Sequence, residues 1–255
     1  MDTISLLWRH EQQPAPRRGR PPRFSTDEVV AAGVAVADDV GADFSLREVA
    51  GRLGTPVMSL YSYVESREQL LELMIDHCRA GLPGAPLSGT WRERLATVAA
   101  ENLDLCSRHP WLAHWESERA ILGPGTLAKY ERELHAVEPL PVDDVTKDAI
   151  LTMLLDFVRA SARASEHARA EREAEDPRQW WEREGERLAA LHLGARYPLA
   201  GRVGNAAGEA HGAAVDAQAA YRFGLRLILD GVAAVAAGAG PAGAEQPTAP
   251  KPRGE

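Results

Sequence analysis

The sequence predicts an all-α protein with a small N-terminal helical domain and a larger C-terminal one. Strand signals are nearly absent, because the chain is rich in Ala, Leu, Glu and Arg and shows little alternation of β-branched or aromatic residues. Helix start signals recur instead, each a Ser followed three residues later by Glu or Gln. The length of 255 residues is sufficient for two domains that each bury a core.

The segment 45–64 predicts two short amphipathic helices joined by a tight turn. Ser45 and Glu48 can form a capping box, so the first helix begins after Ser45. Apolar residues follow at helical spacing, and they are Leu46, Val49, Ala50 and Leu53. Gly54 suits the left-handed residue that ends this helix. Thr55 and Pro56 are expected to supply the N-cap and the first turn of the second helix, residues 56–63. This pattern is typical of a helix-turn-helix that binds DNA.

The same domain extends to both sides of the helix pair. Ser25 and Glu28 can form a second capping box, which begins a helix that ends near Gly41. Ser66 is placed to cap a further helix after the pair. We therefore expect four helices within a DNA-binding domain that spans residues 25–81.

This domain resembles the DNA-binding domain of the tetracycline-repressor (TetR) family of bacterial regulators. The similarity rests on Arg47, on the helix pair with Gly54, and on residues 59–71, in which a Leu-Tyr-x-aromatic-Val segment precedes a basic residue and a leucine pair. The rest of the chain resembles the family in its helical layout and in Trp91 after a Ser/Gly loop. The resemblance implies a homodimeric, ligand-responsive transcriptional repressor, which leaves its operator when a small molecule binds the C-terminal domain.

The resemblance also implies which residues contact double-stranded DNA. Those expected in this domain are Ser45, Arg47, Val57, Met58, Ser59, Tyr61, Ser62, Tyr63 and Arg67. The second helix lacks Lys and Arg, so Arg47 is the candidate for a bidentate contact to guanine. Arg67 is expected to contact a phosphate. Because Ser62 and Glu65 replace more typical aromatic and basic residues, phosphate binding by the helix pair is expected to be weak.

Residues 1–24 are expected to form a flexible arm rich in Arg and Pro. Arg18-Gly19-Arg20-Pro21 is the core sequence of AT-hook proteins, in which extended arginines enter a narrow minor groove. Two interpretations remain open for Arg18 and Arg20, namely minor-groove insertion and a solvated linker near the phosphates. The apolar run 4–8 either stays in the arm or packs on the body of the protein as an anchor.

Charge and cysteine content set limits on function and location. The formal net charge of −8 disfavours nonspecific coating of nucleic acid, so any DNA binding must be localised. Cys78 and Cys106 lie on apolar helical stripes, which favours buried reduced thiols over a disulfide. No segment reaches the length of a membrane-spanning helix or of a signal-peptide core, so we expect a cytoplasmic protein with no membrane partner.

The C-terminal domain is expected to span residues 90–237, after a Pro/Gly-rich loop. A long helix that starts near Asp143 and a last helix over about 214–237 are apolar on more than one face, which indicates burial on two sides. Such helices either pair with a second copy as a four-helix bundle or lie in a monomeric core. The residues expected at the dimer interface are Leu151, Leu154, Leu155, Val158, Phe223, Leu227 and Ile228.

Two segments of the C-terminal half carry weaker signals. Residues 165–211 are first charged and then Gly/Ala-rich, so we expect a mobile connection with one short helix from about Trp180 to Leu193. Within the predicted domain, the stripe 127–137 is expected to turn Leu127 and Tyr130 inward. The tail 238–255 is rich in Gly, Ala and Pro and is expected to be disordered.

A pocket for a small-molecule effector is expected among aromatic and polar residues outside the dimer helices. Its candidate lining is Asn102, Trp111, His114, Trp115, Met153, Phe157, Trp180 and Trp181, although each of these can equally be a core residue. His109 and His114 lack further ligands nearby, so no metal site is expected and no cofactor is implied. The sequence shows no catalytic motif, which disfavours an enzyme. A constitutive DNA-binding regulator with no effector remains the main alternative.

Overall fold

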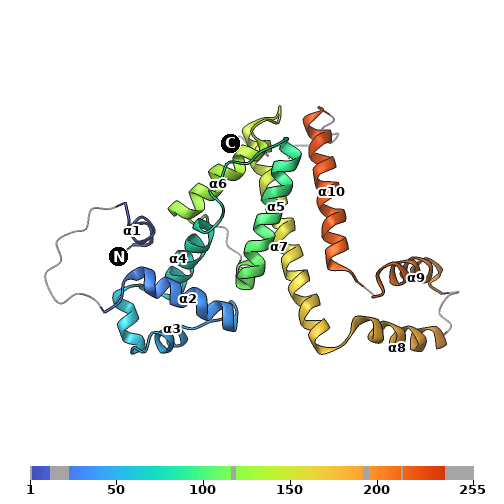
Figure 1. The fold of residues 1–255 in the computed structure, drawn as a ribbon, viewed down its shortest axis with the longest axis horizontal. Coiled ribbons are helices and arrows are strands. Elements are labelled where there is room, and N and C mark those ends of the chain that lie inside the picture. The colour runs from blue at the N-terminus through green and yellow to red at the C-terminus, as the bar shows by residue number, and fades with distance from the viewer. Residues whose placement is uncertain (1, 12–22, 116–118, 192–195, 214, 239–255) are drawn as a thin grey trace, which may run out of the picture.

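A computed structural model describes residues 2–11, 23–115, 119–191, 196–213 and 215–238, and every regular element in these residues is helical. The prediction of an all-α fold is confirmed. The first elements along the chain are α1 (Thr3–Leu7), α2 (Thr26–Val40), α3 (Leu46–Arg52), the 3₁₀ helix η1 (Val57–Ser62) and α4 (Arg67–Ala80). They gather at one end of the molecule (Figure 1).

The C-terminal part of the chain is built on a bundle of four helices. Its elements are α5 (Trp91–Arg108), η2 (Pro110–His114), α6 (Pro124–Val137), α7 (Asp144–Ala174), α8 (Pro177–Ala190), α9 (Pro198–His211) and α10 (Ala217–Ala236). Helices α5, α6, α7 and α10 pack together. Helices α8 and α9 project from this bundle at the far end of α7 (Figure 1).

Two hydrophobic cores hold these elements. The first is formed by α1 to α4 and continues into η2, where Trp111 and Leu112 are buried against it. The second lies inside the α5, α6, α7 and α10 bundle, with Leu95, Leu151 and Leu154 at its centre. The start of α5 packs in the second core, whereas its end and η2 pack on the first. The two parts of the chain meet along α4, η2 and α6.

The predicted helix starts are largely confirmed. Ser25 with Glu28 and Ser45 with Glu48 form complete capping boxes, and the Ser66 side chain accepts a hydrogen bond from the backbone of Gln69. Gly54 has the left-handed φ of 61° that the turn requires. The prediction that Thr55 caps the second helix is wrong, because η1 begins after Pro56 without any side-chain cap.

The start of the chain differs from the expected extended arm. Asp2 caps helix α1, and Leu6 and Leu7 are buried. The Trp8 indole N–H donates to the carbonyl of Leu122 at 2.7 Å, so the apolar run 4–8 is the anchor that the sequence leaves as one alternative. Arg18 and Arg20 of the expected arm lie outside the described residues, as does the tail after residue 238.

The expected connection over 165–211 is also different. Helix α7 continues to Ala174, and α8 and α9 are two separate helices rather than one. The predicted apolar stripe of α6 is only partly buried, because Val137 is buried whereas Leu127 and Tyr130 are exposed and Glu133 is buried in their place. A run of 31 residues makes α7 about 46 Å long, so its last turns reach beyond the bundle.

Candidate functional site

The candidate DNA-reading surface lies on α3 and η1. Arg47 and Ser62 are exposed. Met58 and Tyr61 are 72% and 49% exposed, although both side chains are large and mainly apolar. Val57 and Ser59 are partly buried beside them. On the opposite side of η1, Leu60 is fully buried. The helix pair is therefore fixed from below and presents an arginine, a thioether and a phenol outward. We call Arg47, Met58, Tyr61 and Ser62 the reading face.

Three residues that are predicted to contact DNA have hydrogen-bond partners within the protein. The Arg67 guanidinium donates from Nε to the carbonyl of Phe44 at 2.7 Å and from another nitrogen to the carbonyl of Ala42, and it lies over the Phe44 ring. Arg67 thus fastens α4 to the loop before α3, and its contact to a phosphate stays a prediction. The Ser45 hydroxyl is engaged in its capping box, and the Tyr63 hydroxyl accepts from the backbone N–H of Phe24.

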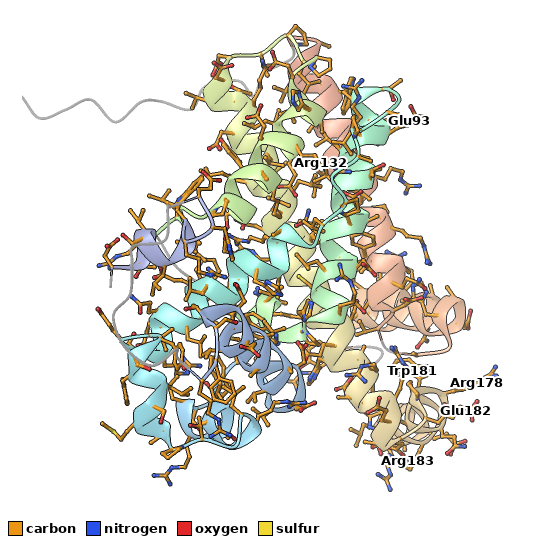
Figure 2. All side chains as sticks on the ribbon, turned by 60° about the vertical axis from the view of Figure 1, so that its left-hand side comes forward. Glu93, Arg132, Arg178, Trp181, Glu182 and Arg183 are labelled. Atoms are coloured by element: carbon orange, nitrogen blue, oxygen red, sulfur yellow. The ribbon has the colours of Figure 1, made fainter. Side chains whose placement is uncertain are left out.

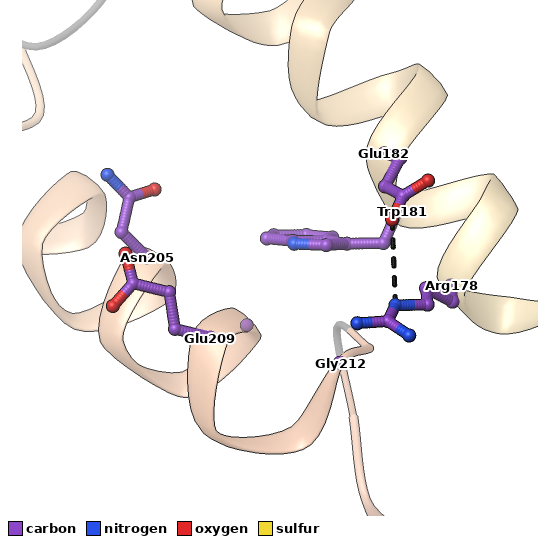
Figure 3. A pocket seen from close by; sticks show the side chains of 7 residues that line it. Arg178, Trp181, Glu182, Asn205, Glu209 and Gly212 are labelled. Atoms are coloured by element: carbon purple, nitrogen blue, oxygen red, sulfur yellow. Dashed lines mark ion pairs between the residues drawn. The ribbon is translucent and has the colours of Figure 1, made fainter.

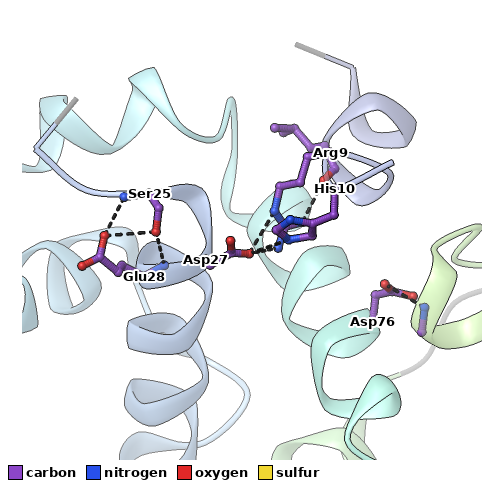
Figure 4. Close-up of polar contacts among 8 residues, drawn as sticks. Arg9, His10, Ser25, Asp27, Glu28 and Asp76 are labelled. Atoms are coloured by element: carbon purple, nitrogen blue, oxygen red, sulfur yellow. Dashed lines mark hydrogen bonds and ion pairs between the residues drawn. The ribbon is translucent and has the colours of Figure 1, made fainter. Parts of the chain in front are cut away.

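A buried carboxylate joins α4 to α6 across the domain junction. Helix α6 has no side-chain cap of its own, because its N-cap is Gly123. Asp76 of α4 takes this place, accepting from the backbone N–H groups of Gly125 at 3.2 Å and Thr126 at 2.7 Å (Figure 4). A Cβ at Gly125 would lie 2.2 Å from the backbone carbonyl of Asp76, so the two helices approach as closely as glycine allows. The position of α6 is thereby fixed against α4.

A second polar contact joins η2 to α2. Asp38 accepts from the Trp111 indole N–H at 2.8 Å, and the same carboxylate lies 2.9 Å from Nδ1 of His109. Trp111 is almost completely buried. It lies at the junction, where it fixes η2 to the DNA-binding part, and its role in a ligand pocket stays a prediction.

The other predicted pocket residues do not converge on one site. Asn102 is buried, where it donates to Glu133 at 2.6 Å, whereas Met153 is 47% exposed on the outside of α7. His114 lies 2.7 Å from the Glu166 carboxylate. Phe157 stacks on Tyr221 with ring centroids 5.7 Å apart. The Tyr221 hydroxyl is buried and has no hydrogen-bond partner within the described part of the chain, and burial raises its pKa.

Trp181 lines a surface pocket of about 310 Å³ between α8 and α9. Its ring packs against Gly208, and Asn205 and Glu209 of α9 lie opposite (Figure 3). Trp180 on the same helix is exposed. Figure 2 shows the labelled α8 side chains apart from the main body of the protein. This pocket therefore lies on the α8–α9 projection and not at the junction between the two parts of the chain. Trp180 and Trp181 thus belong to a different region from Asn102 and Trp115.

A buried charged cluster lies beside Asn102, and no local pattern in the sequence indicates it. Lys129 donates to Glu133 at 2.6 Å, and both side chains are nearly inaccessible. Arg79 of α4 lies over the Trp115 ring, with 5.5 Å between its guanidinium carbon and the ring centroid. Burial lowers the pKa of Lys129 and of Arg79, and Glu133 opposes both effects. A Lys-x-x-x-Glu pair on a helix is usually a surface pair, so only the packing of α6 against α4 and α5 reveals this cluster.

Comparison with known proteins identifies the family. The sequence model of the tetracyclin repressor-like C-terminal domain matches residues 82–236. The chain belongs to the TetR family. The HTH-type transcriptional repressor DrrR1 of Streptomyces coeruleorubidus is 33% identical over 235 residues, which cover 90% of this chain and 84% of that protein. Like this relative, the protein is a transcriptional regulator.

Solved TetR-family structures share the fold. ActR of Streptomyces coelicolor in complex with actinorhodin has a TM-score of 0.63 and 25% identity, and the match covers 88% of this chain and 100% of ActR. BioQ bound to its double-stranded DNA operator has a TM-score of 0.53 and 18% identity, over 83% of this chain and 99% of BioQ. The BioQ likeness shows a common architecture for the helix-turn-helix and the C-terminal bundle.

The described residues contain no cluster of three potential metal ligands. Within the same residues, no helix is long and apolar enough to cross a membrane. Cys78 and Cys106 are free and buried, as the sequence predicts. Burial raises the pKa of the Cys78 thiol to about 12, so this thiol is protonated at neutral pH.

Proposed function

We propose that the protein is a homodimeric repressor that binds a two-fold symmetric operator in the cytoplasm and releases it when a small molecule binds the C-terminal part. The reading face carries this proposal, because it is an exposed, partly apolar surface on a helix pair that is fixed on its other side. Exposed apolar side chains such as Met58 and Tyr61 are typical of a surface that binds a partner rather than one that contacts only water. Their position on η1 suits the thymine methyl groups and sugars of a major groove.

Arg47 supplies the polar base contact in this scheme. It is exposed on α3, beside η1, and its guanidinium can donate two parallel hydrogen bonds to a guanine. The partly buried Val57 and Ser59 define how deeply η1 enters the groove. Ser62 donates to the carbonyl of Ser59 at 2.7 Å, and this exposed hydroxyl would have to exchange that bond for one to a phosphate oxygen.

The dimer is proposed to form through the outer faces of α7 and α10. Phe223 and Leu227 are four residues apart on α10, so they lie on one face, and both are more than half exposed. Met153 is exposed on α7, which packs beside α10. Partly buried Leu155 and Ile228 complete the proposed surface. Leu151, Leu154 and Val158 are buried in the core of the chain itself, which corrects their assignment to the interface.

The projecting helices α8 and α9 extend this surface. The exposed apolar side chains of α8, its C-cap residue and α9 are Trp180, Leu188, Leu191, Leu199 and Val203. Neither helix packs extensively on the bundle of its own chain. A second copy placed against α7 and α10 would cover this apolar area, which supports a dimer rather than a monomeric core.

Ligand responsiveness is supported by the junction and by ActR, a relative of 25% identity whose structure contains actinorhodin. Asp76 and Asp38 connect α6 and η2 of the C-terminal part to α4 and α2 of the DNA-binding part. An effector that displaces α6 or η2 would therefore change the distance between the two reading faces of a dimer. Operator half-sites are about 34–36 Å apart, so such a change weakens binding.

Selection of DNA fragments by the purified full-length protein tests this proposal. We expect enrichment of one sequence with two-fold symmetry. On that site, Arg47→Ala should weaken binding by about 1–3 kcal/mol and relax the preference at one base pair in each half-site. Arg178→Ala on α8 is the matched control and should bind normally. Failure to enrich any symmetric site would contradict the proposal, and equal weakening on all sequences would make Arg47 a phosphate contact.

A further inference from the structure

The N-terminal segment 3–10 contacts three parts of the chain that are distant from it in sequence. Helix α1 packs on α4, and its Leu6 and Leu7 are buried in the first hydrophobic core. The Thr3 hydroxyl accepts from the Gln69 side-chain amide at 3.2 Å, which adds a polar contact to α4. A helix of five residues is too short to be stable by itself in water, so α1 depends on these contacts.

The end of this segment contacts α2. Arg9 donates from Nε to the Asp27 carboxylate at 3.0 Å and from a second nitrogen to the same oxygen (Figure 4). Nε2 of His10 lies 3.1 Å from that oxygen. Arg9 also donates to the Leu6 carbonyl at 2.8 Å, so its guanidinium joins the C-terminal end of α1 to the first turn of α2. The segment is thus fixed to α2 as well as to α4.

Trp8 connects the same segment to the C-terminal part of the chain. Its indole N–H donates to the carbonyl of Leu122 at 2.7 Å, and the neighbouring Ile121 is buried in the first core. Leu122 precedes Gly123, the N-cap of α6, and Asp76 of α4 accepts from the first turn of that helix. The entry to α6 is therefore held from two directions, by Trp8 and by Asp76.

We propose that segment 3–10 is a clasp that fixes the orientation of the DNA-binding part relative to the C-terminal bundle, with Trp8 and Arg9 as its positioning residues. Trp8 contacts the entry to α6, Arg9 contacts α2, and the two residues are adjacent in the chain. A change in the angle between α2 and α6 therefore strains one contact or the other. In a dimer this angle sets the separation of the two reading faces, which has to match the operator half-sites. This consequence rests on the dimer and the operator proposed above.

Amide hydrogen exchange of the full-length protein tests whether the two contacts act together. Trp8→Phe keeps an aromatic ring but removes the indole donor, and Arg9→Gln removes the ion pair with Asp27. Trp8→Phe should speed exchange across residues 121–128 about fivefold, because one hydrogen bond at the entry to α6 is lost. Arg9→Gln should speed exchange in the same residues by a similar factor, although the contacts of Arg9 are with α1 and α2. A residue that merely stabilises its own surroundings would not produce this distant effect.

Three further variants complete the exchange experiment. Arg9→Lys keeps a cation that can pair with Asp27, so exchange across 121–128 should stay within about twofold of the wild type. Arg178→Gln is the matched control, because it removes an arginine whose ion pair lies within α8, and it should leave exchange across 121–128 unaltered. Trp8→Phe combined with Arg9→Gln should exchange at most about twofold faster than either single variant, because opening one end of the clasp already releases the other. If Trp8→Phe does not fold by circular dichroism, Arg9→Gln and Arg9→Lys still decide the question.

Operator binding tests the consequence for the proposed function. On the selected operator, Trp8→Phe and Arg9→Gln should each weaken binding about threefold or more, although neither acts by contacting DNA. Arg9→Lys and Arg178→Gln should bind normally. Base preference and the slope of log affinity against log salt should stay unchanged in all four variants, because a positioning residue neutralises no phosphate. A smaller slope in Arg9→Gln would make Arg9 a phosphate contact and would overturn the inference.

The outcomes keep this inference separate from the proposed function. Unchanged exchange across 121–128 in either Trp8→Phe or Arg9→Gln would overturn the clasp, as would an equal rise in Arg178→Gln. Faster exchange with unchanged operator affinity would also overturn it, because segment 3–10 would then stabilise the junction without positioning the DNA-binding part, and the DNA-binding proposal would stand. If no symmetric operator is selected, the proposed function fails, and the exchange measurements still decide whether the clasp joins the two parts of the chain.

Discussion

The DNA-binding part and the α8–α9 projection are both small helical units, yet they are held in different ways. Helices α2, α3 and α4 each have a side-chain cap and a buried face, and they share one core. Helix α8 also has a side-chain cap, from Asp176, but it has no buried residue, and α9 has only Gly208 among its described residues. The comparison teaches that caps define where a helix begins, whereas a buried face decides whether the helix is fixed within its own chain.

The two units also expose apolar residues for different reasons. On η1, Met58 and Tyr61 are exposed while Leu60 below them is fully buried, so the exposed residues belong to a rigid surface. On α8 and α9, exposed Leu188 and Leu199 have no such support. The first surface suits a rigid partner such as duplex DNA. The second requires another protein surface to fix it, which the second copy of the proposed dimer would supply.

The largest expected effect distinguishes the core of the bundle from its outer face. Leu154 is fully buried and Leu227 is 53% exposed, although both are leucines on the long apolar helices. Leu154→Asp should bury an unpaired charge and destabilise the fold by more than about 4 kcal/mol. Leu227→Asp should leave the helical content unchanged and shift the dimer toward monomer. Circular dichroism during urea unfolding and sedimentation velocity measure the two effects.

A dimer that survives Leu227→Asp with unchanged affinity would exclude the outer face of α10 as the interface. Phe223→Asp, one turn away, provides an independent second substitution on that face. If both variants remain dimeric, α7 or the projection rather than α10 must hold the two copies together.

The junction and the projection can be compared through two glycines. A Cβ at Gly125 would collide with the backbone of α4, whereas Gly185 on α8 has no neighbouring atom within 4 Å. Gly125→Ala should therefore destabilise the protein by about 1–3 kcal/mol through overpacking. Gly185→Ala should stabilise α8 slightly, because alanine favours the helix by about 1 kcal/mol. Thermal unfolding of both variants tests the difference, and equal melting temperatures would show that α4 and α6 separate easily.

How far the sequence predicts each region depends on the distance along the chain between interacting residues. The starts at Ser25 and Ser45 and the turn at Gly54 depend on residues within one or two turns, so the sequence is sufficient. The burial of Glu133 depends on α4 and α5, which are distant in sequence, and a local pattern cannot show it. Helix α9 is Gly/Ala-rich and resembles a loop in composition, so its sequence does not predict a helix.

The candidate sites divide in the same way. Arg47 and Met58 are predicted on an exposed face and are exposed. Arg67 is predicted from the family resemblance, and its guanidinium binds the carbonyl of Phe44, because the loop before α3 lies beside α4. Trp111 has the residue type of a ligand contact, but its partner Asp38 lies 73 positions earlier in the chain. Long-range partners of this kind are settled by tertiary packing.

The basic segment before α2 contains Arg17, Arg18 and Arg20, and we expect it to contribute to operator affinity. Replacing Arg17, Arg18 and Arg20 by Ala should lower operator affinity and reduce the slope of log affinity against log salt by about 0.9 for each phosphate that is no longer neutralised. Substitution is preferable to deletion of residues 1–23, since deletion would also remove buried Leu6 and Leu7. Fluorescence anisotropy over a salt series gives the slope. An unchanged slope would mean that these arginines do not meet the DNA backbone.

The smallest expected effect on stability comes from removing a helix cap, and two caps can be compared. Ser45 caps α3 in the fixed part and Asp176 caps α8 in the projection, and each accepts a backbone hydrogen bond in the first turn. Ser45→Ala should lower the free energy of unfolding by about 1 kcal/mol and weaken operator binding, because α3 supports η1. Asp176→Ala should loosen α8 alone, which hydrogen exchange would detect without a change in global unfolding or operator affinity.

The capping box at Ser45 also makes the effect of this substitution depend on pH. The hydrogen bonds from Ser45 lower the pKa of the Glu48 carboxyl in the folded state. Its stabilising contribution is therefore complete above the ordinary pKa of a glutamate and is lost as the pH falls through the lower folded value. The destabilisation caused by Ser45→Ala should accordingly shrink as unfolding is measured at increasingly acidic pH. A difference between wild type and variant that stays constant down to pH about 3 would show that the carboxylate adds nothing to the cap, so that the hydroxyl alone begins α3.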